Sequence, residues 1–128
     1  MRLGVDDMCF ACGKSNPIGL KLQFRFDGED YVTEFEVKPE HQGWTGIAHG
    51  GLLATVLDEA MARLLWEKGL NAITGRLSVR YHRSLRVGEV VQVRARIAKQ
   101  RSLGIETSAE AMRDGELVAD TTAVSMEV

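Results

Sequence analysis

The chain has 128 residues, of which 45% are hydrophobic and 27% are charged, and its formal net charge is −2. This length and composition suit one globular domain with a buried core and exclude an intrinsically disordered protein. No apolar run reaches the roughly 18 residues of a membrane span, and the N-terminus lacks the apolar core of a signal peptide, so we expect a cytoplasmic protein.

The N-terminal part of the chain has no hydrophobic periodicity, and a turn is expected at Pro17, so residues 1–19 are predicted to be an irregular lead-in. The lead-in contains one Cys-x-x-Cys, formed by Cys9 and Cys12. A zinc ribbon needs a second such pair, or histidines at ligand spacing, and the sequence has neither. We therefore expect reduced, structural cysteines and no metal site; a metal shared between subunits is the alternative.

Two strands and a hairpin follow the lead-in. Apolar and polar residues alternate over residues 20–26 and again over residues 31–37, which predicts two half-buried strands. The turn between them contains Gly28, which can supply the positive φ of a tight hairpin. Residues 38–48 are predicted to be a loop.

The longest periodic run, residues 47–70, predicts one long helix that opens with His49-Gly50-Gly51 and ends near Lys68-Gly69. Its apolar residues recur at spacings of three and four: Leu53, Val56, Leu57, Ala60 and Leu64. Asp58 and Glu59 lie opposite this apolar arc and point about 100° apart on a helix of 3.6 residues per turn. Only one of the two carboxylates can therefore face a given cleft.

Four further strands are predicted after the helix, over residues 77–82, 91–97, 103–109 and 117–128. This order of elements predicts a single α+β domain over residues 1–128, in which one antiparallel sheet covers one helix. Because one sheet leaves the far side of the helix uncovered, we expect the chain to pair with a copy of itself, with Asp58 and Glu59 meeting the partner.

Three stretches resemble the hotdog-fold acyl-CoA thioesterases, and within them the phenylacetic-acid-degradation type. In HGGLLATVLDEA, Asp58 follows His49 by nine residues. TGRLSVRYHRSLRVGEVV is similar to the family's second characteristic block, and CFACGKSNPIGLKLQF is similar to the lead-in of one subgroup. The resemblance implies a hotdog fold, with an antiparallel sheet wrapped around one long central helix. It also implies a homodimer, often assembled into a homotetramer, and active sites at the subunit interface.

Thioester hydrolysis needs an activated water or a carboxylate nucleophile, and donors where negative charge develops on the carbonyl oxygen. We expect the Gly51 N–H, in the first turn of the helix, to be that donor. The alternative is that Gly50 and Gly51 only permit a tight turn. Asp58 is the expected catalytic carboxylate, as general base or as nucleophile, and its alternative role is an interface carboxylate paired with an arginine. Glu59 is its rival, because some hotdog thioesterases use Glu in this region.

Other polar residues are expected near these groups. His49 either touches the thioester carbonyl region or only fixes the loop. By the resemblance, Thr74 at the start of the next strand helps to hold the attacking water, and from the second subunit it could reach Asp58. Gly43 falls at the Asn position of one subgroup, which leaves the adjacent Gln42 as a stand-in.

The segment from Arg76 to Arg101 contains eight Lys/Arg against one acid, which predicts an anionic partner that touches one region only. Arg80, Arg83 and Arg101 are candidate contacts for the phosphates of coenzyme A; arginines on a solvated strand face are the alternative. Nucleic acid is disfavoured, because the arginines lack interleaved aromatic residues and the chain is acidic. No cofactor is expected, since CoA is part of the substrate.

The sequence thus predicts a thioesterase that hydrolyses an acyl- or aroyl-CoA to free acid and CoA. The alternatives are a hotdog hydratase or dehydratase that uses a His–acid pair, and a non-catalytic acyl-CoA binder. The preferred acyl group depends on the depth of a pocket, which we expect residues from two subunits, such as Trp44, Met61 and Leu65, to set.

Overall fold

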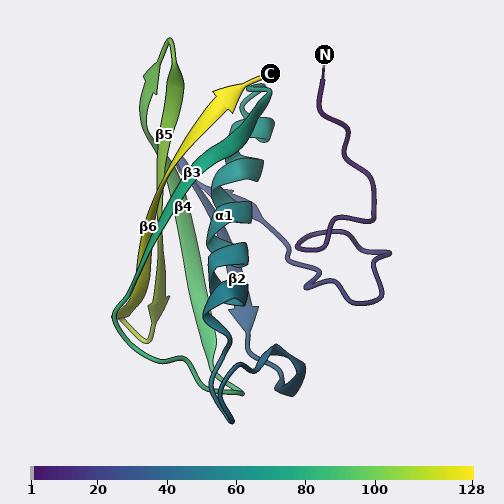
Figure 1. Ribbon diagram of the computed structural model, residues 1–128, viewed down its shortest axis with the longest axis vertical. Helices are drawn as coiled ribbons and strands as arrows, with labels where there is room; N and C mark the ends of the chain where they lie inside the picture. Colours follow the sequence, from purple (N-terminus) through teal and green to yellow (C-terminus); the bar gives the residue numbers. More distant parts are fainter. Residues whose placement is uncertain (1) are drawn as a thin grey trace.

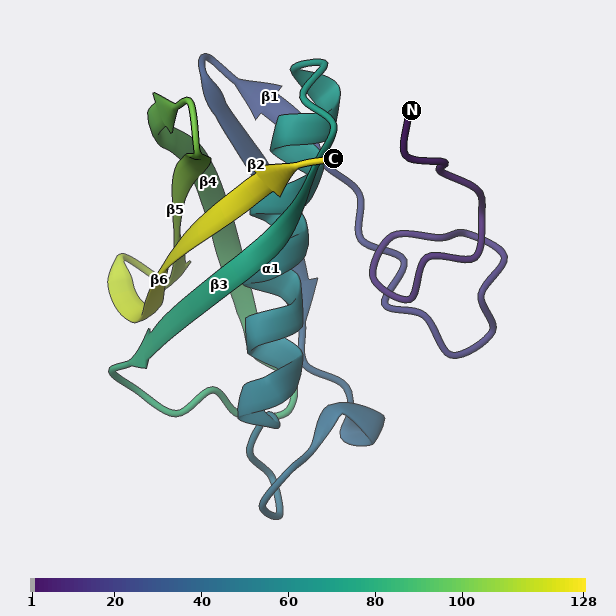
Figure 2. The same cartoon turned by 45° about the horizontal axis from the view of Figure 1, so that its top comes forward.

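The long helix α1 (Gly50–Glu67) lies against one face of a six-stranded antiparallel sheet, so that helix and sheet form two layers (Figures 1 and 2). The computed structural model describes residues 2–128. The remaining elements are β1 (Arg25–Asp27), β2 (Asp30–Glu36), the 3-10 helix η1 (Pro39–His41), β3 (Ala72–Tyr81), β4 (Val90–Arg101), β5 (Gly104–Arg113) and β6 (Glu116–Glu127). The strands pair in the order β1-β2-β4-β5-β6-β3, which confirms the predicted α+β architecture. Neither helix in residues 2–128 combines the length and apolar character that crossing a bilayer requires.

The apolar arc of α1 is buried against the sheet. Its buried residues are Leu53, Val56, Leu57, Ala60, Met61, Leu64 and Leu65. They face inward-pointing residues such as Val91 and Val93 of β4. Since burying one Leu- or Val-sized side chain contributes roughly 1.5–3 kcal/mol, the arc fixes the rotation of α1 and with it the direction of each polar side chain. The helix ends as predicted, with Lys68 as C-cap and Gly69 at a φ of 82°.

The first predicted strand is much shorter than the sequence suggested. Only Arg25–Asp27 pairs with β2, whereas residues 20–24 have no regular structure. The left-handed φ of Lys21, 54°, interrupts an extended chain at this point. The backbone N–H groups of Leu20 and Leu22 donate instead to Phe10 O and Ala11 O in the lead-in, at 2.8 and 2.9 Å. The alternating pattern therefore reflects burial against the lead-in and α1, not a ladder of strand hydrogen bonds.

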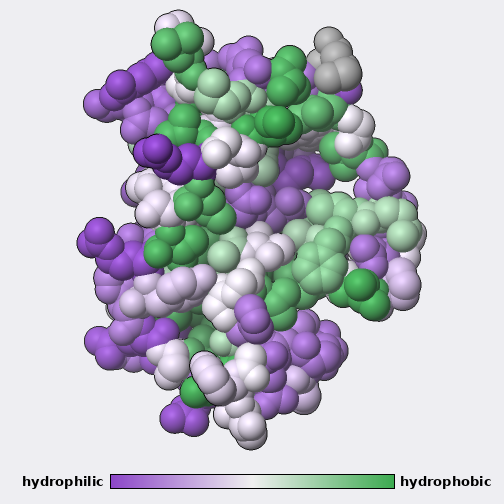
Figure 3. Space-filling model, viewed as in Figure 1, coloured by the Kyte–Doolittle hydropathy of each residue, from purple (hydrophilic) through white to green (hydrophobic). Residues whose placement is uncertain are grey.

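The N-terminal segment, residues 2–24, covers a flank of α1 that we expected to be free. In Figures 1 and 2 it runs beside the helix, on the side away from β5 and β6. Trp66 Nε1 donates to Leu3 O at 3.2 Å, and Cys9 Sγ lies 3.4 Å from Glu59 Oε2. Apolar side chains of the segment, Met8 and Phe10 among them, are exposed. Hydrophobic surface is visible on the right of the space-filling view in Figure 3. The expectation that the far side of the helix is uncovered was therefore wrong for this flank.

β3 is an edge strand with a register shift between Thr74 and Arg76, at Gly75. The extra residue changes the phase of the strand. Thr74 faces α1 before the shift, whereas Val79 and Tyr81 face α1 after it. Apolar side chains remain exposed along this edge, with Ile73 at 51% and Tyr81 at 49%.

Candidate active site

Asp58 and Thr74 form the first half of the candidate site. The Thr74 hydroxyl donates to Asp58 Oδ1 at 2.8 Å, and both side chains are half-buried. β3 runs back along α1 after the turn at Gly69, which brings the start of the strand level with the middle of the helix. The hydroxyl therefore reaches the carboxylate within one chain, whereas we expected it to come from the second subunit.

The N-terminus of α1 forms the second half. His49 is the N-cap, and its Nδ1 accepts a hydrogen bond from the Gly51 N–H at 2.9 Å. The Leu52 N–H donates to His49 O at 3.0 Å. Of the first helical amides within residues 2–128, the Gly50 N–H is the one without a partner. The Gly51 amide that we predicted as the oxyanion donor is thus already engaged, and Gly50 carries the unpaired donor.

Tyr81, which the sequence analysis did not single out, closes this end of the site. Its hydroxyl donates to Gly50 O at 2.6 Å, and a Cβ on Gly50 would lie 3.4 Å from that hydroxyl. Burial raises the pKa of Tyr81, so the phenol stays protonated and remains a donor at neutral pH. The sequence did contain a signal for Tyr81, because it shares a strand face with Leu77 and Val79. A strand that runs antiparallel to the preceding helix places its last residues beside the first turn of that helix.

Two adjoining cavities, of about 510 and 450 Å³, open at the helix N-terminus. Gly50, Trp44, Ala48 and Tyr81 line both cavities. Trp44 is 83% exposed at this position, whereas Met61 and Leu65 are only 2% and 0% exposed. The prediction that Met61 and Leu65 set the depth of the pocket was therefore wrong for the isolated chain, because both side chains belong to the packed core.

The loop before the helix explains the glycine at residue 43. A Cβ there would lie 3.1 Å from His49 Cα, a tight contact that a larger residue could make only if His49 moved slightly. The neighbouring Gln42 is used inside the loop, since its Oε1 accepts from the Gly46 N–H and its Nε2 donates to Pro39 O at 2.7 Å. Gln42 therefore supports the loop and does not reach the unpaired Gly50 amide.

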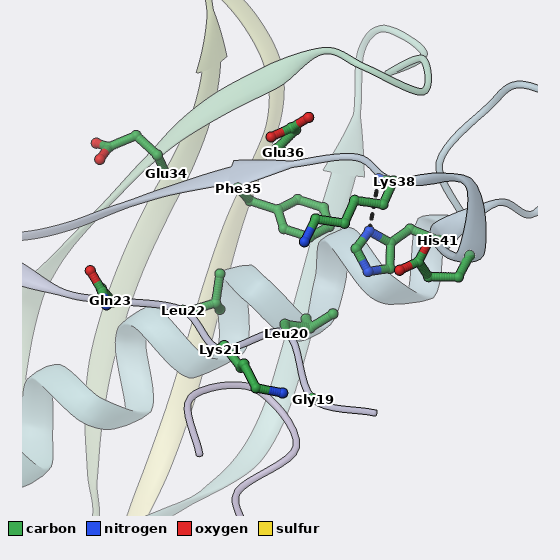
Figure 4. A pocket seen from close by; sticks show the side chains of 11 residues that line it. Gly19, Leu20, Lys21, Leu22, Gln23, Glu34, Phe35, Glu36, Lys38 and His41 are labelled. Carbon is green, nitrogen blue, oxygen red and sulfur yellow. Dashed lines mark hydrogen bonds between the residues drawn. The ribbon is translucent and has the colours of Figure 1, made fainter. Parts of the chain in front are cut away.

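A separate hollow lies between the N-terminal segment and β2, with a volume of about 350 Å³. Charged side chains dominate its lining, including Lys21, Glu36 and Lys38, and the His41 ring accepts from the Lys38 backbone (Figure 4). Neither Asp58 nor Gly50 lines this hollow, so it is not the candidate active site.

The family model of the thioesterase superfamily matches residues 45–119, more than half of the chain. The chain belongs to the thioesterase superfamily. Acyl-coenzyme A thioesterase 13 of Mus musculus is 31% identical over 74 residues, which make up 56% of this chain and 53% of that protein. The chain thus spans about half the length of the curated relatives that it matches.

Solved structures of other superfamily members share the fold. A phenylacetic acid degradation-related protein of Ralstonia eutropha JMP134 has a TM-score of 0.75 at 24% identity, covering 84% of this chain and 85% of that one. A hypothetical thioesterase protein of Streptococcus pneumoniae TIGR4, solved with coenzyme A, has a TM-score of 0.78 at 18% identity, covering 84% and 85%. The predicted hotdog fold is confirmed.

The two halves of the site in this thioesterase-superfamily chain lie too far apart to act together within one copy. Gly50 and Asp58 are eight residues apart on α1, which corresponds to about 12 Å along the axis. Reacting atoms must approach to about 3–3.5 Å. The expectation that one helix brings both groups to a single carbonyl carbon therefore does not hold within one chain.

Glu59, the rival carboxylate, faces another environment. Its Oε2 lies 3.4 Å from Cys9 Sγ in the N-terminal segment, on a different flank of α1 from Thr74. Asp58 is therefore the carboxylate that accepts the Thr74 hydrogen bond, whereas Glu59 lies beside the Cys9 thiol.

The three candidate arginines do not converge within one chain. Arg83 lines the smaller cavity at the helix N-terminus and lies 3.5 Å from Glu116. Arg101 is bonded to Glu106 at 2.9 Å in the hairpin between β4 and β5, level with Thr74 across the sheet. Arg80 has no ion pair within residues 2–128, and strand alternation turns it away from α1.

Proposed function

We propose that this chain is a thioesterase that hydrolyses an acyl- or aroyl-CoA to free acid and CoA. Superfamily membership supports this activity, as do the curated relatives named acyl-coenzyme A thioesterase 13 and the coenzyme A bound to the S. pneumoniae protein. The observation that carries the proposal is the Asp58–Thr74 pair, a carboxylate and a hydroxyl held 2.8 Å apart beside an edge strand. The proposed reaction consumes only water and the thioester, so it needs no cofactor.

In this proposal the active form is a homodimer in which the two β3 strands pair antiparallel. The exposed apolar side chains and unpaired backbone groups of this edge strand favour such pairing. With a twofold axis near Leu77 and the extra residue at Gly75 passed over, Thr74 of one copy lies opposite Val79 of the other, near that copy's Tyr81. The Asp58 half of one copy then faces the Gly50 half of its partner, which removes the separation of about 12 Å along the helix. Association of two dimers gives the homotetramer that the resemblance implies.

Each group has a defined role in the proposed reaction. The unpaired Gly50 N–H, at the positive end of α1, donates to the carbonyl oxygen as charge develops there. Asp58 takes a proton from water as the water oxygen attacks the carbonyl carbon, or attacks the carbon itself to form a mixed anhydride that water then cleaves. Thr74 orients the carboxylate and the water. The carbon–sulfur bond breaks and its electron pair leaves on the sulfur. The thiolate then accepts the proton that Asp58 took from water or, in the anhydride route, a proton from solvent, and leaves as CoA.

The S. pneumoniae protein supports this choice of residues. It has also been solved with an Asp replaced by Ala and with a Thr replaced by Ala, at two positions sixteen residues apart. Asp58 and Thr74 are also sixteen residues apart. The phosphates of CoA are assigned to Arg80 and Arg83 near the helix N-terminus, with Arg101 as a more distant candidate. A cytoplasmic location stays a prediction of the sequence.

The test is release of free thiol from short, medium, long and aryl acyl-CoAs by the full chain. We expect turnover with at least one class, and a dimer or larger assembly by light scattering. Saturable CoA binding without thiol release from any substrate would indicate a binding protein and overturn the proposal. Addition of water across an acyl-CoA double bond, with no thiol release, would indicate a hydratase instead.

A further inference from the structure

A second cluster of reactive side chains lies on the flank of α1 that the proposed hydrolysis does not use. The Sγ atoms of Cys9 and Cys12 and a carboxylate oxygen of Glu59 all lie within 4.8 Å of one another. The two cysteines come from the N-terminal segment, whereas Glu59 comes from the middle of the helix. The sequence alone could not reveal this third group, because fifty residues separate Cys9 from Glu59.

We propose that Cys9, Cys12 and Glu59 bind one divalent, thiophilic metal ion of the Zn²⁺ type. Two thiolates and a carboxylate are a ligand set that such an ion accepts. In a tetrahedral zinc site, a sulfur and an oxygen ligand lie about 3.6 Å apart, and two sulfurs about 3.8 Å apart. The observed distance of 3.4 Å from Cys9 Sγ to Glu59 Oε2 is close to the first of these values.

The turn that carries the cysteines has the form of a metal-binding loop. The Cys12 N–H donates to Cys9 Sγ at 3.4 Å, and such a bond stabilises a sulfur that carries negative charge. The Gly13 N–H donates to Cys9 O at 2.8 Å. A Cβ at Gly13 would lie 2.4 Å from Asp7 O and 2.5 Å from Cys9 N, so the tight turn requires glycine at this position.

The charges around the cluster also suit a divalent cation. Two thiolates and one carboxylate carry −3, and a divalent ion neutralises two of these charges. The Arg63 guanidinium, which also pairs with Glu67 at 3.2 Å, lies 3.5 Å from Cys12 Sγ and offsets part of the rest. A thiol must lose its proton before it can bind a metal ion. Metal binding therefore displaces the thiol protons to solvent.

The fourth coordination position opens into a cavity of about 320 Å³. Its lining includes Asp6, Met8, Cys9, Glu59 and Arg63. We assign this position to water, which fits a site with three protein ligands. The bound ion links the N-terminal segment to the helix residue next to Asp58.

The experiment titrates the reduced chain with Co²⁺ under anaerobic conditions. We expect one Co²⁺ per chain, a thiolate-to-cobalt charge-transfer band, and loss of that band when Zn²⁺ is added. Reduced protein that gives no charge-transfer band, even with excess Co²⁺, would overturn the proposal.

Variants assign the ligands. Cys9→Ser and Cys12→Ser should each weaken the band and lower the Co²⁺ affinity by at least about tenfold, and Glu59→Gln should lower the affinity by about tenfold while both sulfurs remain. Glu36→Gln, an exposed carboxylate on β2, is the matched control and should bind Co²⁺ as the parent does. Equal affinity in all four variants would rule the site out.

A measurement on the unmodified chain tests the site even if the cysteine variants fail to fold. Zn²⁺ should protect both thiols from alkylation in the parent, as counted by mass spectrometry. Equal alkylation with and without Zn²⁺ would contradict the assignment.

Discussion

Asp58 and Glu59 are neighbours in the chain, yet the fold gives them different surroundings. Asp58 accepts a hydrogen bond from Thr74 on β3, whereas Glu59 lies against Cys9 of the N-terminal segment. The rotation of about 100° per helical residue separates them, and the buried apolar arc of α1 fixes that rotation. Two chemically similar carboxylates therefore serve two different sites: Asp58 pairs with a hydroxyl, and Glu59 lies against a thiol.

The comparison predicts that the two carboxylates are not interchangeable. Asp58→Asn should lower turnover by about 10²- to 10⁴-fold, the usual contribution of a general base, without weakening Co²⁺ binding. Thiol release and the cobalt band measure the two effects, and circular dichroism checks the fold.

Glu59→Gln is the paired variant and should show the reverse pattern. Its loss of turnover should stay below about tenfold while its Co²⁺ affinity falls. If Glu59→Gln lowered turnover more than Asp58→Asn did, Glu59 rather than Asp58 would be the catalytic carboxylate.

Thr74→Val tests whether the hydroxyl matters to the Asp58 flank. Removing it should lower kcat by up to about 100-fold, because the carboxylate and the water lose their orientation. Thr74→Ser keeps the donor and should recover most of the rate. Equal rates for the Val and Ser variants would show that the hydrogen bond of 2.8 Å has no part in turnover.

Gly13→Ala tests the Glu59 flank without touching a charged group. The new Cβ would collide with Asp7 O at 2.4 Å, so the turn must shift. We expect the free energy of unfolding to fall by about 1–3 kcal/mol, measured by denaturant titration, and Co²⁺ affinity to fall with it. Gly4→Ala is the control, because its Cβ would meet no atom within 4 Å. Similar destabilisation by both variants would mean that the tight turn is not the cause.

Tyr81→Phe should have the smallest effect. It removes the hydrogen bond to Gly50 O, which is worth about 0.5–1.5 kcal/mol of stability. Since the Gly50 N–H is the proposed oxyanion donor, we expect a modest fall in kcat with little change in KM. A change confined to KM would place Tyr81 in substrate binding rather than in positioning Gly50.

Much of the fold could be predicted because periodicity reports burial directly. The long helix, the glycine C-cap and the four later strands all follow from spacing along the chain. The first strand was mispredicted, because residues 20–24 alternate for burial but bond to the lead-in. Alternation of apolar and polar residues shows which side chains are buried, but not which backbone groups accept the segment's hydrogen bonds.

The candidate site was only partly accessible from the sequence. Asp58 and Thr74 could be selected from the resemblance, but their hydrogen bond within one chain depends on how far β3 travels back along α1. The engagement of the Gly51 amide depends on the His49 rotamer, which no pattern encodes. Cys9 and Glu59 meet only through tertiary packing.

The extra residue at Gly75 gives β3 two halves whose side chains are oriented independently. If the strand kept its length and lost the irregularity, Thr74 would still face the helix, but Arg80 would take the place of Tyr81 at the opposite end. The phenol that holds Gly50 would then be exchanged for a guanidinium, while the acid–alcohol pair stayed intact. A single insertion or deletion in this strand can thus change one end of the crevice during evolution and leave the other end as it was.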